Sequence, residues 1–157
     1  MEGRNIPFAL TFSGDLLKAE VTWIKDMRFI ASGDSKLGIV VDIPEEGHEG
    51  ERIGPGPMEL MLIGVGACTA SDVVWILRKQ RVQLQRLELR LQAERASTDP
   101  KMFTKIHIEY MVAGKGLKEK AVATAIRLSH EKYCSATNSV VRGGATITAS
   151  HRIVEAA

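Results

Sequence analysis

The sequence lacks several features that would point to a particular class of protein. Lys and Arg number 21 against 19 Asp and Glu, so the net charge is only +2, and the basic residues are spread along the chain. Nucleic-acid binding therefore has little support. The chain also lacks internal repeats, low-complexity tracts and linkers, and 157 residues suit one domain of ordinary size. We expect a single domain over residues 1–157, with an N-terminal extension at 1–16 and a core at 17–155.

We expect no targeting signal. The N-terminal stretch MEGRNIPFALTFSGDLL carries acidic residues and does not have the charged-then-apolar order of a signal peptide, so we expect a cytoplasmic protein. The apolar run from Leu60 to Ala70 contains no charge, but a membrane span needs about 20 predominantly apolar residues. Glu59 and Asp72 lie only thirteen positions apart. We therefore predict a helix buried in protein and no association with a membrane.

The composition that is present, 45% hydrophobic and 25% charged residues, is typical of a soluble globular protein. Its periodic stretches predict an α+β domain with antiparallel sheet. Strands are expected at 17–26, 36–44, 82–95, 103–114 and 145–155, a loop at 44–57, and helices at 57–79 and 117–134. A slip of phase around Gln85 and Arg86 predicts a β-bulge, and the Asp-Pro turn in STDPKM predicts a hairpin.

The first predicted helix carries two glycines, Gly64 and Gly66, in its interior. Each costs roughly 1 kcal/mol relative to alanine. A helix that accepts this cost usually has a neighbour packed closely against its backbone. We therefore expect this helix to be central in the fold.

The two cysteines, Cys68 and Cys134, leave three interpretations open. Free cysteine is among the most buried residue types, so both could be plain core residues. A metal site is a second interpretation, but the sequence has no short ligand pair such as C-x-x-C. Histidines that could join such a site are His48, His107, His130 and His151. The third interpretation is a redox pair.

A redox pair makes structural demands. The attacking sulfur must be a thiolate, which requires a nearby cation or a helix N-terminus. Cys68 lies beyond the first turn of its predicted helix, where the helix dipole acts, so a cation must come from elsewhere, and arginine is the natural choice. Cys134 could capture the sulfenic acid if its helix packs against the first one, with the two Cα atoms within roughly 7 Å.

Three segments of the sequence carry a resemblance. PMELMLIGVGACTASDVVWIL, ERASTDPKMFTKIHIEYMVAG and AIRLSHEKYCSATNSV resemble the OsmC/Ohr family of osmotically inducible and organic hydroperoxide resistance proteins, and the likeness covers about residues 18–155. It implies an OsmC-like fold with antiparallel sheets around a long central helix, in a cytoplasmic, intertwined homodimer with active sites at the subunit interface. It also implies an antioxidant thiol peroxidase for organic hydroperoxides, without a bound cofactor and re-reduced by an external dithiol such as lipoylated protein.

The resemblance also implies roles for single residues. Cys68 matches the peroxidatic cysteine and Cys134 the resolving one. Arg28 stands about where the family has an arginine that is donated across the interface to the thiolate, although it could also be an ordinary solvated turn residue. The family's active-site glutamate directly follows the helix-opening proline, where this chain has Met58, and Glu59 comes one residue later. One step along a helix turns a side chain by about 100°.

Apolar neighbours of Cys68 are candidates for a substrate pocket. Met61, Leu62, Ile63 and Trp75 could line a site for an alkyl chain, although plain core packing is the more common role of such residues. Two other functions stay open on the same scaffold. One is a redox-sensing or small apolar ligand-binding protein with little peroxidase turnover, and the other is a structural protein with inert cysteines.

Overall fold

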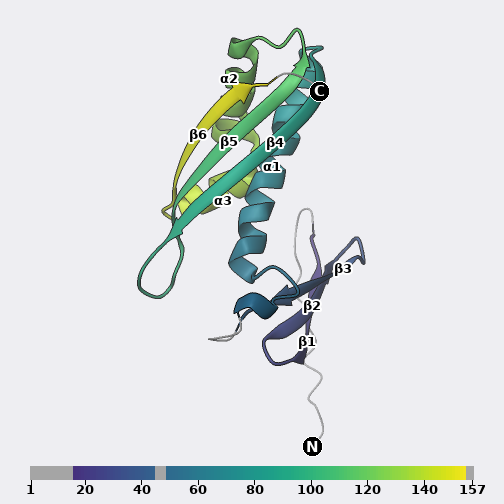
Figure 1. The fold of residues 1–157 in the computed structure, drawn as a ribbon, viewed down its shortest axis with the longest axis vertical. Coiled ribbons are helices and arrows are strands. Elements are labelled where there is room, and N and C mark those ends of the chain that lie inside the picture. Colours follow the sequence, from purple (N-terminus) through teal and green to yellow (C-terminus); the bar gives the residue numbers. More distant parts are fainter. Residues whose placement is uncertain (1–15, 45–48, 155–157) are drawn as a thin grey trace, which may run out of the picture. The chain divides into compact units, whose positions relative to one another are not determined.

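The computed structural model describes residues 16–44 and 49–154. The chain divides into two compact units, Met1–Pro57 and Met58–Ala157, called here the smaller and the larger unit. Figure 1 shows both as ribbons coloured along the sequence. The α+β fold class predicted from the sequence is confirmed, since the two units contain two three-stranded sheets and three α-helices within the described residues.

The smaller unit is an antiparallel sheet in the order β1-β2-β3. Its strands are β1 (Ala19–Lys25), β2 (Arg28–Gly33) and β3 (Gly38–Asp42), followed by the short 3-10 helix η1 (Glu49–Glu51). The sequence did not predict β2, because RFIASG is short and its apolar residues do not alternate cleanly. The strand is instead defined by pairing with a neighbour on each side.

The larger unit begins with α1 (Pro57–Lys79), whose two ends agree with the sequence prediction. The strands β4 (Gln83–Arg95) and β5 (Phe103–Lys115) form the predicted antiparallel hairpin. The register shifts between Leu84 and Arg86, where the slip of phase had predicted a bulge. The sheet is completed by β6 (Thr146–Ile153).

The pairing of β6 corrects the expectation of antiparallel sheet throughout. β6 lies parallel to β5, from Lys105 beside Thr146 to Val112 beside Ile153. Parallel neighbours require a long crossover connection, and the chain between these strands is long enough to hold several helical segments. Helices α1, α2 and α3 lie on one face of this sheet in Figure 1.

The crossover corrects a second expectation, a single helix over 117–134. It contains α2 (Glu119–Leu128), the π-helical turn η2 (Ser129–Tyr133) and α3 (Ser135–Arg142). Cys134 has extended backbone angles, φ −70° and ψ 100°, and is the N-cap of α3. Cys134 therefore begins a helix, α3, that was not predicted. The apolar spacing typical of a helix continues through residues 129–134, where the backbone is no longer α-helical, so the sequence predicted one uninterrupted helix to residue 134.

The core of the larger unit lies between α1, β5 and α2, and its largest fully buried side chain is Tyr110. A Cβ on Gly66 would lie 2.9 Å from Cδ1 of Leu91, so the close packing predicted for the glycines holds at this position. It does not hold at Gly64, where a Cβ would meet nothing within 4 Å.

The burial of α1 is one-sided. By length and composition α1 could cross a membrane, but one third of its most apolar window is buried inside the chain. The buried residues are Val65, Gly66, Thr69, Val73, Ile76 and Leu77. One face of α1 therefore packs into the core of the larger unit, whereas Met61, Ile63 and Trp75 on other faces remain about half exposed, so the helix is less buried than the sequence predicted.

Candidate functional site

The two cysteines come together inside the larger unit. Cys68 is on α1, and Cys134 caps α3. Their sulfur atoms and a carboxylate oxygen of Asp72 all lie within 4.8 Å of one another. The two sulfurs are therefore close to one another, although both thiols are free in this structure.

The two thiols differ in access. Cys68 is half-buried, whereas Cys134 is 0% exposed. A reactant from solvent can reach the Cys68 sulfur more easily than the Cys134 sulfur. The difference fits the order of events implied by the resemblance, in which Cys68 reacts first.

The environment of Cys134 favours the protonated thiol. Burial raises the pKa of Cys134, and the neighbouring Cys68 adds to this effect. The hydroxyl and backbone N–H of Thr137 oppose it, and this N–H donates to the Cys134 sulfur over 3.3 Å. Desolvation is the largest of these influences, so Cys134 needs a proton acceptor before it can act as a nucleophile.

Backbone contacts fix the position of Cys134. Its N–H donates to the Ser129 carbonyl at 2.8 Å, which closes the π-helical turn. Its carbonyl accepts from the backbone N–H of Asn138 at 3.0 Å and from Nδ2 of the same residue at 2.9 Å. Single π-helical turns often occur at functional sites, and here the turn places the sulfur at the start of α3.

A buried chain of hydrogen bonds lies next to the cysteines. Ser129 Oγ donates to Asp72 Oδ2 at 2.9 Å and lies 2.9 Å from Thr69 Oγ1. The Thr69 hydroxyl lies 2.8 Å from the Tyr110 hydroxyl, which lies 2.8 Å from His130 Nε2. Thr69, Ser129 and Tyr110 are all 0% exposed.

Sequence reasoning missed this chain, apart from naming His130 as a possible metal ligand. One signal was available. Thr69 directly follows Cys68 on a helix of apolar residues, and a hydroxyl in such a position must find a partner when it is buried. Nothing in the sequence, however, indicated that the partner would be Tyr110, 41 positions away.

The described histidines do not join the two thiols and Asp72. His107 lies between the hydroxyls of Thr148 and Ser150, at 2.8 Å and 3.0 Å. His151 Nε2 lies 2.5 Å from a carboxylate oxygen of Glu119, and His130 belongs to the buried chain. His48 lies outside the described residues.

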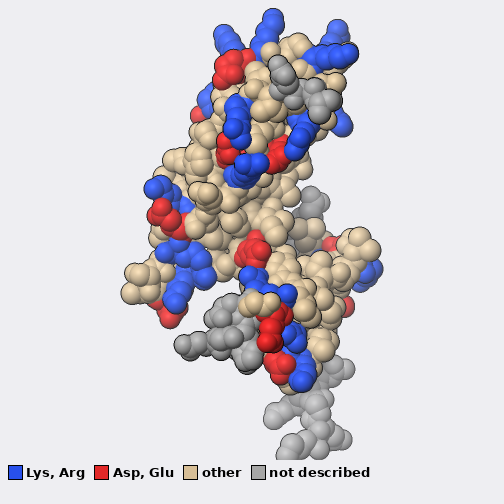
Figure 2. Space-filling model, in the orientation of Figure 1, with Lys and Arg blue, Asp and Glu red and all other residues tan. Residues whose placement is uncertain are grey.

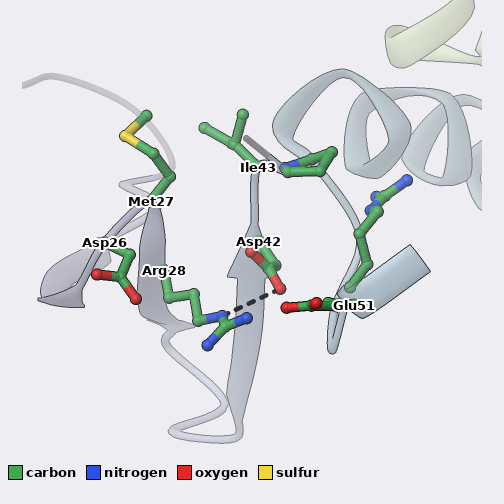
Figure 3. Close-up of a pocket in the computed structure, with 8 residues that line it drawn as sticks. Asp26, Met27, Arg28, Asp42, Ile43 and Glu51 are labelled. Carbon is green, nitrogen blue, oxygen red and sulfur yellow. Dashed lines mark hydrogen bonds and ion pairs between the residues drawn. The ribbon is translucent and has the colours of Figure 1, made fainter. Parts of the chain in front are cut away.

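Arg28 belongs to the smaller unit, where it begins β2. Its Nε lies 3.3 Å from Oδ2 of Asp42, as Figure 3 shows. Asp42 also accepts the backbone N–H of Ile53 at 3.0 Å, and this bond, followed by Arg28, lowers the pKa of Asp42 against the opposing effect of burial. Arg28 is therefore a strand residue and not a turn residue. Its side chain is 37% exposed, pairs with the buried Asp42 and lines a cavity of about 250 Å³, and its role beside a thiolate stays a prediction.

The remaining predicted site residues lie at different places on α1. Glu59 is an exposed residue in its first turn. Met61 lines an apolar cavity of about 550 Å³. Leu62 packs against the core, and Trp75 packs edge-to-face on Tyr133 at 5.9 Å. Of the four substrate-pocket candidates, Met61 therefore faces a cavity, and the substrate-binding roles of Met61, Leu62, Ile63 and Trp75 stay predictions.

Charges are mixed on the surface of each unit. Figure 2 shows acidic and basic side chains lying among one another over much of the visible face. Glu88, for example, pairs with Arg86 and with Arg90, and these two arginines lower its pKa.

Comparison with known proteins agrees with this architecture. The profile of the family described as OsmC-like protein matches residues 47–150. Protein YhfA of Escherichia coli strain K12 is 37% identical over 140 residues, which are 89% of this chain and 100% of YhfA.

Solved structures share the fold. A hypothetical protein from Aquifex aeolicus VF5 has a TM-score of 0.79 at 27% identity, over 92% of this chain and 100% of that chain. An organic hydroperoxide resistance protein OsmC from Legionella pneumophila has a TM-score of 0.67 at 18% identity, over 89% of this chain and 98% of that chain, a likeness of fold. The family profile and the full-length match to YhfA confirm the resemblance found in the sequence: the chain belongs to the OsmC-like family.

Proposed function

We propose that the protein is a thiol-dependent peroxidase that reduces organic hydroperoxides. The observation that carries the proposal is an accessible thiol, Cys68, within 4.8 Å of a buried thiol, Cys134. This pair can form a sulfenic acid and then a disulfide. The name of the Legionella relative, an organic hydroperoxide resistance protein, suggests the substrate class.

The proposed reaction has three steps. The Cys68 thiolate attacks one peroxide oxygen, the O–O bond breaks, and the alkoxide takes up a proton to leave as an alcohol. Cys134 then attacks the sulfur of the Cys68 sulfenic acid, which forms the S–S bond and releases water. An external dithiol, such as lipoylated protein, reduces the disulfide by exchange and is itself oxidised to a disulfide.

The cation for the Cys68 thiolate is the second part of the proposal. Arg28 supplies this charge from the other chain of a homodimer, and a guanidinium suits the role because it stays charged when partly buried. Glu59 orients Arg28 in the assembled site. Formation of the site would then require Arg28 to exchange or share its present partner, Asp42.

Exposed apolar side chains support a homodimer. Large apolar residues on β1 of the smaller unit, and others on α1 of the larger unit, keep about half or more of their surface exposed in the single chain, and large exposed apolar side chains are common at interaction sites. They are Val21, Trp23, Ile24, Met61, Ile63 and Trp75. A second copy of the chain would cover them in a cytoplasmic dimer. Met61, Leu62 and Trp75 are proposed to contact the alkyl part of the substrate.

The decisive experiment is to add cumene hydroperoxide and count free thiols. We expect the wild type to lose both thiols, Cys134→Ser to stop at a sulfenic acid that dimedone traps, and Cys68→Ser to keep its remaining thiol. The proposal fails if the wild type keeps both thiols while another thiol peroxidase is oxidised in the same assay. Equal peroxide consumption by Cys68→Ser and wild type would refute the assignment of the nucleophile.

A second candidate function is binding of a small apolar ligand, or redox sensing, with little turnover. The apolar cavity of about 550 Å³ lined by Met58, Met61, Met102 and Phe103 favours it. An apolar fluorescent probe that binds there while both thiols resist peroxide would select this function over the first.

A further inference from the structure

The carboxylate of Asp72 is the described acidic group within reach of both sulfurs. It lies one helical turn after Cys68 on α1, so both side chains are on the same face of the helix. The roles proposed for Arg28 and Glu59 do not involve the Asp72 carboxylate. Its Oδ2 accepts a hydrogen bond from the Ser129 hydroxyl at 2.9 Å.

The buried chain behind Asp72 has a fixed direction. Each hydroxyl has a single proton. Because Ser129 donates its proton to Asp72, the Ser129 oxygen can only accept from Thr69. The Thr69 hydroxyl must then accept from Tyr110, whose oxygen must accept from His130 Nε2–H.

The surroundings agree with this direction. Burial raises the pKa of Tyr110, so its phenol keeps the proton that it donates. Burial lowers the pKa of His130, so its ring is neutral at neutral pH and carries the single N–H that the chain requires at Nε2. Every donor therefore points along the chain toward Asp72.

We propose that Asp72 is the general base that deprotonates Cys134 during disulfide formation, and that Ser129 and the hydroxyls behind it are positioning residues for this carboxylate. The proposal rests on the proposed function for its biological setting. It addresses a need that the proposed function leaves open, since a buried thiol must lose a proton before it can attack.

The proton balance of the step closes without another reactant. Asp72 takes the proton from Cys134, whose sulfur attacks the sulfur of the Cys68 sulfenic acid. The S–S bond forms, the S–O bond breaks, and the Asp72 carboxyl group returns the proton to the leaving hydroxide as water. Cys68 sulfur is reduced from the sulfenic level to the disulfide level, and Cys134 is oxidised to the same level.

Asp72→Asn is the sharpest test, because an amide oxygen can still accept from Ser129 but cannot take up the proton. In single-turnover experiments we expect disulfide closure to slow by about 10²-fold or more, the usual effect of losing a general base. Formation of the Cys68 sulfenic acid should be nearly unchanged. Formate should restore part of the closure rate in Asp72→Ala, which a purely structural role would not permit.

Ser71→Ala is the matched control. Ser71 lies next to Asp72 on α1, is exposed, and donates to the Ala67 carbonyl at 2.8 Å. Its removal should leave both steps at wild-type rates. Wild-type closure in Asp72→Asn would overturn the proposal, as would a slow Asp72→Ala on which formate has no effect.

A peroxide-free assay separates this inference from the proposed function. Dithiobis(nitrobenzoate) forms a mixed disulfide on Cys68, and attack by Cys134 releases a second coloured thiolate, so closure is observed directly. If the wild type does not react with peroxide but Asp72→Asn slows release of the second coloured thiolate, the proposed function fails and the inference about Asp72 stands. If the wild type consumes peroxide and closure is independent of Asp72 in both assays, the inference alone fails.

Discussion

The Thr69 hydroxyl is predicted to be a large single contributor to the stability of the larger unit. It bonds Tyr110 at 2.8 Å and Ser129 at 2.9 Å, and all three residues are 0% exposed. Thr69→Val keeps nearly the same shape and removes both bonds. Two net hydrogen bonds of about 1 kcal/mol each, plus the cost of polar partners left buried and unpaired, give a loss of about 2–4 kcal/mol.

Urea unfolding, followed by far-ultraviolet circular dichroism, measures this loss. With an m-value of about 2 kcal/mol/M, the urea concentration at the midpoint of unfolding should fall by roughly 1–2 M. Wild type and variant must be compared at equal protein concentration, because association of subunits adds to apparent stability. Ser71→Ala, an exposed hydroxyl on the same helix, should stay within about 0.5 kcal/mol of wild type. A Thr69→Val midpoint equal to that of Ser71→Ala would refute the reasoning.

Two further predictions concern the glycines of α1 and the carboxylate of Asp42. Gly64→Ala should stabilise by up to about 1 kcal/mol through helix propensity, whereas Gly66→Ala brings its Cβ to 2.9 Å from Leu91 Cδ1. At Gly66, overpacking that costs about 1–3 kcal/mol should cancel or exceed this gain. The melting temperature of Gly64→Ala should therefore be higher than that of Gly66→Ala, and the reverse order would contradict the close contact with Leu91. The pKa of Asp42 is lower in the folded protein than in the unfolded chain, so the ionised carboxylate stabilises the smaller unit at neutral pH. This contribution should be lost as the pH falls below about 4, the usual pKa of an aspartate. Asp42→Asn should therefore flatten the acid side of the stability profile measured by urea unfolding, and a profile parallel to wild type would count against the Ile53 and Arg28 contacts as its cause.

Local signals explain what the sequence predicted well. Pro57, which suits the first helical turn, and the apolar run after it predicted a helix over 57–79, and α1 spans Pro57–Lys79. The slip at Gln85 and Arg86 appeared directly in the alternation of β4, because a bulge shifts the phase of the side chains. Each of these features depends on residues within a few positions of one another.

Features set by distant contacts could not be predicted. β2 depends on pairing with β1 and β3, and the parallel position of β6 depends on a crossover in which the sequence predicted one helix over 117–134 and did not predict α3. The site shows the same limit. Cys68 and Cys134 were recognisable as a pair through the family resemblance, but their partners Asp72 and Ser129 meet across 57 positions of sequence. No local pattern marks such a contact.

Burial of Cys134 has two opposite effects on the proposed reaction. In the proposed reaction, a sulfur with 0% exposure is protected from direct oxidation by a bulky peroxide, so the first step is assigned to the more accessible Cys68. The same burial raises the pKa of the Cys134 thiol and thereby slows the attack that must follow. A resolving thiol can be this well hidden only if a proton acceptor is hidden with it. Asp72, held by a chain of donors that all point toward it, is placed to meet that requirement.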